Sequence, residues 1–365
     1  MKRVKLQKRL IALAVSFVLL IGCVGFTASA EDTNLAPIEQ YKAYIDSLDW
    51  ASYQTHNEMV EAAQIPNNLL NQMSTSDLVE AVMNYPLIVN LVMYSTYQKG
   101  FERIVQDFNG MQELLSKGDG AQKLFEYYNS IPIMSVNTRS SINEEIILNP
   151  WFAEIMLAQN EFIEQFSYTE QENVIAIINE KHEQKQSSPE IYSGTSVGFY
   201  EATMENNNIS TYDYTTTVYT RKGSPVPVVV VSYHFTPLEV SNLNKKTDAA
   251  YPNAVRVGNA CNQYNCHSYA WYSQSESNGY WLEPNNVYRF INDGSYYKTY
   301  ARVGAVVKYL SDDHSAVVTA VSGNHASWVR SKWGKAGIYV HTPDYGYNAG
   351  QNDVGDKSWK LTYYI

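Results

Sequence analysis

The spacing of apolar residues changes once along this chain, near residue 186, and this change sets two different folding patterns. Before it, apolar residues recur at helical spacing, as in the run that begins at Leu78 behind Ser74-x-x-Asp77. After it, "TTTVYTRKGSPVPVVVVSYHF" is rich in β-branched and aromatic residues on both sides of a turn at Lys222-Gly223-Ser224-Pro225. The first pattern predicts helices that open with a capping box, and the second predicts a β-hairpin.

The two patterns predict two folded parts. A second capping-box pattern, Thr169-x-x-Glu172, precedes another apolar run, and Gly and Pro residues separate several helices between residues 36 and 185. We therefore expect an all-α domain at 31–185, a linker and β-hairpin region at 186–250, and an α+β domain with an antiparallel sheet at 251–365. A chain of 365 residues with 45% hydrophobic content is long enough for two cores.

Residues 1–30 have the parts of a secretory signal peptide: a basic start, an apolar stretch and the small-x-small site Ala28-Ser29-Ala30. A membrane span is disfavoured because the apolar stretch is short and acidic residues follow it. Leu20-Ile21-Gly22-Cys23 also fits a bacterial lipoprotein cleavage site. We expect a secreted or cell-envelope protein, with a membrane anchor only if Cys23 is lipidated.

The charge of the chain is acidic and uneven. The formal net charge is −10, and removal of five basic residues with the signal peptide would leave −10 − 5 = −15. Residues 31–250 carry 12 basic and 29 acidic residues, whereas residues 251–365 carry 10 and 8. Because nucleic acid and anionic lipid repel an acidic protein, we expect no nucleic-acid partner.

Three cysteines are present, and only Cys261 and Cys266 lie outside the expected signal peptide. A small secreted domain held by disulfides would have more. The two could pair with each other, but a loop this short is seldom free of strain. A secreted chain that keeps a thiol raises the prospect of a reactive one.

Cys266 lies in the segment "YNCHSYAWY", residues 264–272, which predicts a short helix from about Cys266 to Ser275. Asn265 is suited to cap that helix. A cysteine at a helix N-terminus is favoured as thiolate, and free backbone N–H groups there can hold an oxyanion. We interpret Cys266 as a nucleophile rather than a buried structural cysteine, and Cys261 as structural. His267 is expected to face away from the site.

A thiolate nucleophile needs a histidine base, and His314 has the most suitable context. It opens the predicted strand "HSAVVTAVS", after the strand "RVGAVVKYL" and the acidic turn "SDD". A third predicted strand, "SWVRSKWG", follows another turn at Gly323-Asn324. This order places His314 at the end of a sheet, where a cysteine on a helix could face it.

These residues resemble the papain-like cysteine hydrolases of bacterial cell walls, in particular the NlpC-type peptidases and the CHAP amidases. The resemblance covers roughly residues 250–345. It matches Cys266 to the nucleophile, Tyr269-Ala270 to the aromatic-small pair, Gly304 to the strand-entry glycine and His314 to the base. The chain departs from the family pattern at Ala305, where an aspartate is usual.

The resemblance implies a papain-like domain that hydrolyses an amide bond of peptidoglycan, either within the stem peptide or between sugar and peptide. The runner-up substrate is an ordinary protein or isopeptide bond. Neither cofactor nor metal is implied, and reducing conditions should help. The residue that orients the base is left open between Ser331, Lys332 and His341, with Ser331 the preferred candidate because a lysine would oppose imidazolium formation.

Two other interpretations stay open. The domain could be a catalytically inactive papain-like module that binds wall peptides or another protein, because the third catalytic residue is unassigned. Cys261-x4-Cys266-His267 is also a stretched relative of the haem attachment motif Cys-x-x-Cys-His, although its spacing is wrong for that motif. The helical domain shows no chemistry of its own, so we expect it to serve as a platform for a protein partner or substrate.

Overall fold

The computed structural model describes residues 35–135, 144–206, 214–350 and 360–365. The expected signal peptide, with Cys23, lies outside these residues. Residues Pro37–Ile365 form one compact unit. Among the described residues, no helix has both the length and the apolar character needed to cross a membrane.

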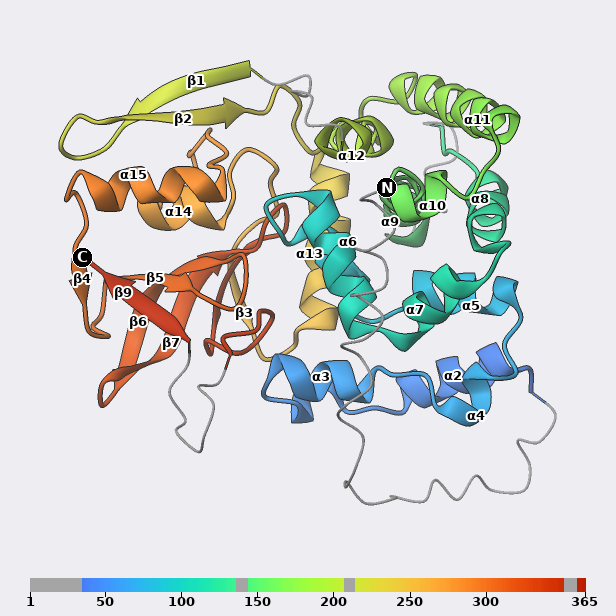
Figure 1. Ribbon diagram of the computed structural model, residues 1–365, viewed down its shortest axis with the longest axis horizontal. Helices are drawn as coiled ribbons and strands as arrows, with labels where there is room; N and C mark the ends of the chain where they lie inside the picture. Colours follow the sequence, from blue (N-terminus) through green and yellow to red (C-terminus); the bar gives the residue numbers. More distant parts are fainter. Residues whose placement is uncertain (1–34, 136–143, 207–213, 351–359) are drawn as a thin grey trace, which may run out of the picture. The chain divides into compact units, whose positions relative to one another are not determined.

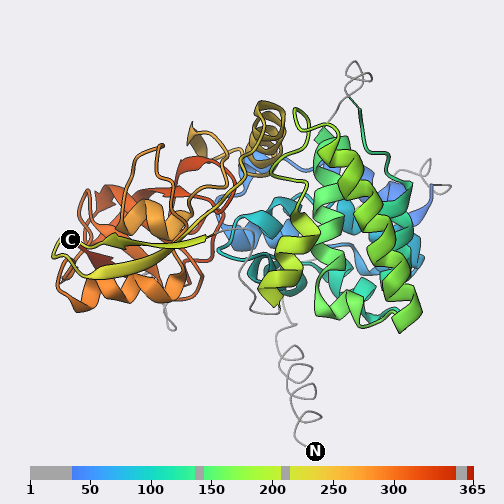
Figure 2. The same ribbon diagram turned by 90° about the horizontal axis from the view of Figure 1, so that it is seen from above.

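Helices and turns make up the described residues of 37–206, here called the helical region (Figures 1 and 2). This confirms the predicted all-helical character of the N-terminal part. Its elements are α2 (Pro37–Asp46), η1 (Trp50–Ser52), α3 (His56–Ala62), α4 (Asn67–Leu70), α5 (Thr75–Met83), η2 (Ile88–Val92), α6 (Tyr97–Asp107), α7 (Asn109–Ser116), α8 (Gly120–Ser130), α9 (Glu144–Leu157), α10 (Asn160–Ile163), α11 (Tyr168–Gln186) and α12 (Gly198–Asn206).

Side-chain caps define where several of these helices begin. Ser74 and Asp77 form the predicted capping box at the start of α5. The prediction for α11 was wrong by two residues, because Ser167 and Glu170 form its capping box instead of Thr169 and Glu172. Ser167 has an extended backbone, with φ −63° and ψ 163°, as a cap residue requires, so the helix begins one position later at Tyr168.

The predicted hairpin is confirmed. Strands β1 (Tyr214–Tyr219) and β2 (Pro225–Val230) pair antiparallel across the turn that contains Gly223, and φ at Gly223 is +85°. This left-handed conformation favours glycine. The helix α13 (Pro237–Ala250) was not expected in the region 186–250. Thr236 and Glu239 form its capping box, and Pro237 occupies its first turn, where the missing N–H costs nothing.

A seven-stranded antiparallel sheet forms the C-terminal part, here called the sheet region, in the order β3-β8-β7-β6-β5-β9-β4. The predicted helical part followed by an antiparallel sheet is thus confirmed. The strands are β3 (Val255–Gly258), β4 (Lys298–Thr299), β5 (Val306–Tyr309), β6 (Ser315–Ser322), β7 (His325–Lys332), β8 (Ile338–His341) and β9 (Leu361–Tyr364).

The two faces of this sheet bury different side chains. Helices α14 (Cys266–Trp271) and α15 (Val287–Asn292), joined through η4 (Pro284–Asn286), cover one face, and Val306 and Val317 pack there in one apolar cluster with Trp271 (Figure 1). Ala316 and Val318 belong to a larger cluster that continues into the helical region. Successive residues of a strand point to opposite faces, so β6 contributes to both clusters.

Close backbone contacts join the helical and sheet regions. The N–H of Lys335 donates to the carbonyl of Val92 at 2.8 Å, and Tyr347 donates its hydroxyl to the carbonyl of Met93 at 2.6 Å. Gly334 has φ +51°, and a Cβ atom there would lie 2.4 Å from the backbone of Val92 and Met93. This close approach therefore requires glycine at position 334.

Candidate active site around Cys266

Cys266 is the first residue of α14 and is buried as a free thiol. Asn265 caps this helix as predicted: its Oδ1 accepts the N–H of Ser268 at 3.0 Å, and its Nδ2 donates to the carbonyl of Leu282 at 2.8 Å. The helix ends at Trp271, earlier than expected from the sequence. Six residues give a weak macrodipole, so a thiolate here needs another charge partner.

His267 supplies such a partner, contrary to the expectation that it would face away. It is buried, and its Nε2 lies 3.1 Å from Oδ1 of Asp313. Its Nδ1 lies 2.9 Å from Oγ of Ser315, which also accepts the indole N–H of Trp271 at 2.9 Å. Because Ser315 is the first residue of β6, the imidazole is held between α14 and the start of that strand.

The charges around His267 favour the imidazolium form. Burial alone lowers the pKa of His267, but the neighbouring Cys266 and the hydrogen bond to Asp313 outweigh it and raise this pKa to about 10. Burial raises the pKa of Asp313, yet His267, Lys99 and Ser95 together hold it well below its usual range. Cys266, His267 and Asp313 thus form a thiol–imidazole–carboxylate series.

His314, the predicted base, lies directly before β6 and is buried. Its ring stacks on Tyr347 with centroids 3.5 Å apart, and Tyr309 meets it edge-on at 4.9 Å. Within the described part of the chain, neither ring nitrogen has a hydrogen-bond partner, so no hydrogen bond joins His314 to Cys266. Burial, with His341 and His267 nearby, lowers the pKa of His314 well below its usual value.

The charge of Cys266 acts on two tyrosines, Tyr347 and Tyr309. Burial raises the pKa of Tyr347 well above its ordinary value, and Cys266 raises it further. Cys266 has the same effect on Tyr309. Both tyrosines contact the ring of His314.

Ser331, the preferred orienting residue, contacts a different histidine. Its hydroxyl lies 2.8 Å from Nε2 of His341 and accepts the indole N–H of Trp333 at 3.0 Å. Nδ1 of His341 lies 2.8 Å from the carbonyl of Thr342 and must donate there, so Nε2 accepts from Ser331. Burial lowers the pKa of His341 to about 4. The structure therefore pairs Ser331 with His341 and not with His314.

Lys332 holds backbone rather than a catalytic group. Its buried ammonium donates to the carbonyls of Cys261, Gly334 and Ala336 at 2.8, 2.6 and 2.6 Å. It also lies over the ring of Tyr264, 5.1 Å from the centroid. Burial lowers the pKa of Lys332, and the two nearby thiols raise it. Cys261 is a free, partly exposed thiol in the segment that Lys332 holds.

Sequence reasoning missed the pairing of His267 with Asp313, although one signal was present. Strand alternation places Ser315 and Val317 on the face of β6 that α14 covers. Asp313 lies two residues before Ser315, so the same alternation could have indicated that both side chains face α14.

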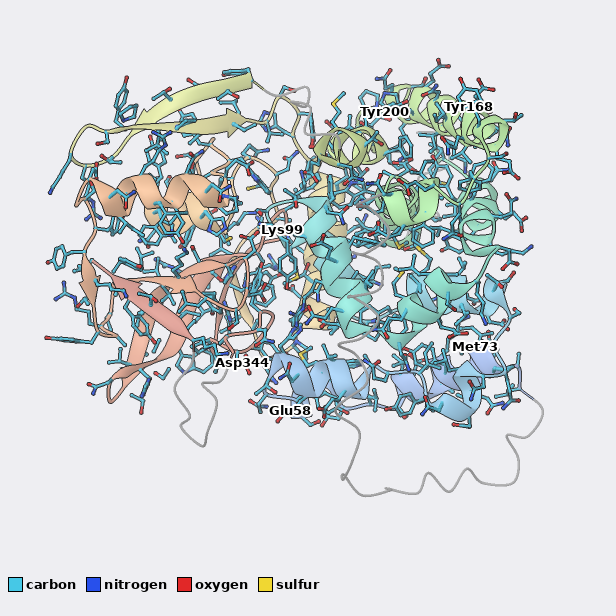
Figure 3. The ribbon with its side chains drawn as sticks, viewed as in Figure 1. Glu58, Met73, Lys99, Tyr168, Tyr200 and Asp344 are labelled. Atoms are coloured by element: carbon cyan, nitrogen blue, oxygen red, sulfur yellow. The ribbon has the colours of Figure 1, made fainter. Side chains whose placement is uncertain are left out.

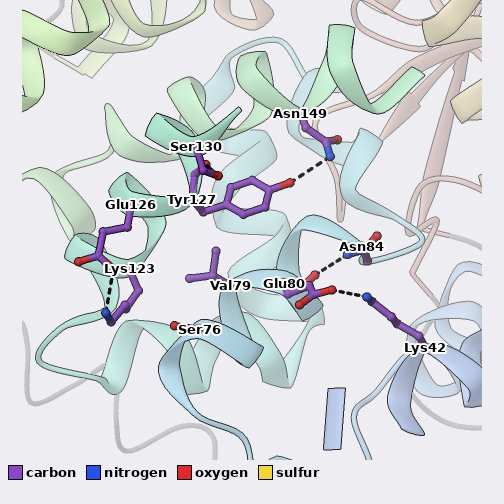
Figure 4. Close-up of a pocket in the computed structure, with 10 residues that line it drawn as sticks. All are labelled: Lys42, Ser76, Val79, Glu80, Asn84, Lys123, Glu126, Tyr127, Ser130 and Asn149. Carbon is purple, nitrogen blue, oxygen red and sulfur yellow. Dashed lines mark hydrogen bonds and ion pairs between the residues drawn. The ribbon is translucent and has the colours of Figure 1, made fainter. Parts of the chain in front are cut away.

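Among the described residues, one pocket lies in the helical region away from Cys266, and another borders Asp313. A pocket of about 520 Å³ in the helical region is lined by Lys42, Glu80, Lys123, Glu126 and other polar residues, with its charges already paired (Figure 4). A second, of about 420 Å³, includes Lys99 and Asp313 in its lining. In the described residues, no group of His, Cys, Asp and Glu side chains is arranged to hold a metal ion.

Comparison with known proteins gives no relative. No protein-family model, no curated protein and no solved structure matches this chain.

Proposed function

We propose that this protein is a secreted bacterial cysteine hydrolase with a papain-like domain, which cleaves an amide bond of peptidoglycan. One observation carries the proposal: the free Cys266 thiol lies next to His267 in the first turn of α14, and Asp313 holds that imidazole by a hydrogen bond. A thiol beside a carboxylate-bound imidazole is the arrangement that activates a cysteine for acyl transfer. The choice of peptidoglycan rests on the sequence resemblance.

The proposed roles divide between the two histidines. The imidazolium of His267 stabilises negative charge at Cys266, but Asp313 and Ser315 occupy both of its nitrogens. Among the described residues neither nitrogen of His314 has a hydrogen-bond partner, and its lowered pKa keeps it neutral, so we assign His314 the role of proton acceptor. Catalytic hydrogen bonds are commonly long before substrate binds, so the missing bond from His314 to Cys266 agrees with this role.

The proposed reaction has two steps. His314 takes the thiol proton as Sγ of Cys266 forms a bond to the carbonyl carbon, and backbone N–H groups near Cys266 hold the oxyanion. His314 then gives the proton to the leaving nitrogen as the C–N bond breaks, which leaves a thioester. In the second step, water adds to the thioester and gives its proton to His314, and that proton returns to Sγ as the C–S bond breaks.

The test is mass spectrometry of peptidoglycan fragments after incubation with the mature protein under reducing conditions. We expect new fragments from the wild type and from Cys261→Ala, the matched thiol control. We expect none from Cys266→Ala or His314→Gln, and a loss of about 100-fold or more in rate for His267→Gln. Equal fragments from wild type and Cys266→Ala would exclude the cysteine mechanism.

The alternative is a catalytically inactive papain-like module that binds wall peptides or another protein. The complete burial of Cys266 favours it, because a substrate must reach the thiol. Co-sedimentation with intact peptidoglycan, without release of fragments by the wild type, is the result that would support this second function.

A further inference from the structure

We propose that Ser95 and Lys99 of the helical region are positioning residues of the Cys266 site, because they hold Asp313 in place on His267. This role rests on the proposed hydrolase function and deepens it. It gives the helical region a part in catalysis besides that of a platform for partners.

The two oxygens of Asp313 have partners in different regions of the chain. Oδ1 faces Nε2 of His267 at 3.1 Å. Oδ2 accepts a hydrogen bond from the hydroxyl of Ser95 and lies 2.9 Å from Nζ of Lys99. Lys99 also donates to Oγ of Ser95 at 3.3 Å. The carboxylate therefore cannot rotate away from His267 without breaking its contacts to the helical region.

The segment before α6 is built to present these groups. The hydroxyl of Thr96 accepts the N–H of Lys99 at 3.2 Å and caps the helix, so Lys99 lies in the first turn of α6 (Figure 3). Tyr94 reaches Oδ2 of Asp312 at 3.4 Å, and Oδ1 of Asp312 accepts the N–H of Asp313 at 2.8 Å. Residues 94–99 thus fix the whole turn that carries Asp313.

The hydrogen bond from Ser95 should orient Asp313 more firmly than the ion pair with Lys99 does. Ser95 is buried, whereas the Lys99 side chain is 39% exposed. An exposed ion pair contributes little to stability because water screens it. A charged hydrogen bond from a buried hydroxyl is stronger and fixes direction.

The charged groups near Asp313 come from several elements. Cys266 and His267 belong to α14, His314 and Asp313 precede β6, Lys99 belongs to α6, and Glu283 precedes η4. Burial raises the pKa of Glu283, and Lys99 and His267 oppose that rise. Lys99 therefore offsets the charge of two carboxyl groups beside the imidazolium.

The effect of pH depends on the state of the Asp313 carboxyl. Its pKa is held below the usual range by His267, Lys99 and Ser95, although burial alone would raise it. A contribution from such a carboxylate is present at neutral pH and is lost as pH falls through the folded-state pKa. Removal of Ser95 or Lys99 loosens the carboxylate and weakens its hydrogen bond to His267, so the imidazolium beside Cys266 should be less stable and the site should fail at a higher pH in the variants.

The experiment measures alkylation of Cys266 by iodoacetamide against pH, in the full mature chain with Cys261→Ala. We expect the acid limb of the rate profile to move up by about one pH unit in Ser95→Ala and in Lys99→Met, because a loosened Asp313 holds the imidazolium of His267 less well and an opposite charge nearby shifts an ionisable group by roughly 1–3 units. Ser95→Thr should restore the wild-type limb. Lys42→Met is the matched control, because Lys42 is also ion-paired in the helical region but has no link to Asp313.

Unchanged acid limbs in both Ser95→Ala and Lys99→Met would overturn the inference. So would an equal shift in Lys42→Met, since the effect would then be a general one of the helical region. The alkylation needs no substrate, so the two proposals fail separately. Peptidoglycan cleavage without a shift would remove the positioning role alone, and a shift without cleavage would remove the hydrolase function alone.

Discussion

Cys266 and His267 are sequence neighbours whose side chains interact, although adjacent helix positions usually diverge. The reason is the place of the pair at the first turn of α14, where Ser315 and Asp313 at the entry to β6 bind the imidazole. His314 meets the cluster differently, stacked on Tyr347. A histidine with bound nitrogens and one with unshared nitrogens can serve different chemical roles.

Substitution of Lys332 distinguishes a structural role from a catalytic role for this buried ammonium group near the thiol. Replacement with methionine removes the donor to three buried carbonyls, so we expect Lys332→Met to lower the free energy of unfolding by about 3 kcal/mol. Urea denaturation measures this. Lys308→Met, whose ammonium contacts the exposed Tyr288 hydroxyl, should lose under about 1 kcal/mol. A Lys332→Met protein of full stability but no activity would instead make Lys332 the third catalytic residue.

At the scale of elements, α14 depends on its cap because it is only six residues long. Asn265 both caps the helix and ties it to Leu282, the residue two before η4. These contacts fix the direction of the turn that carries Cys266.

We expect Asn265→Ala to cost about 1–2 kcal/mol of stability and to reduce the rate of Cys266 alkylation at neutral pH. Ser167→Ala is the control, since it removes the capping box of α11 in the helical region. It should cost a similar free energy in urea denaturation and leave the alkylation rate unchanged. Equal alkylation rates in both variants would show that the cap does not position the thiol.

Elements formed by residues close in sequence were easier to predict than contacts between distant residues. The hairpin, the capping box of α5 and the cap at Asn265 depend on residues close in sequence, and the sequence predicted all three. The helix α13 was missed although Thr236-Pro237-x-Glu239 is a local start signal. The pairing of His267 with Asp313 joins residues 46 positions apart, and the alternation of Asp313 with Ser315 signals only one of the two partners.

At the scale of the molecule, one apolar cluster runs from the helical region into the sheet. The expected domain boundaries stay a prediction, but Ser95 and Lys99 reach the candidate site from the helical region. Composition and charge could not reveal this, because the acidic helical region shows no motif of its own. A site assembled from two distant segments becomes visible only in three dimensions.

Competition between the two thiols of the mature protein tests the activation of Cys266 most directly. Cys261 is partly exposed and Cys266 is buried, so access alone would make Cys261 react first with iodoacetamide. An activated Cys266 reverses this order, so we expect peptide mapping at pH 6 to find Cys266 modified first, and Asp313→Asn to abolish that preference. Faster labelling of Cys261 in the wild type would contradict the claim that Cys266 is an activated nucleophile.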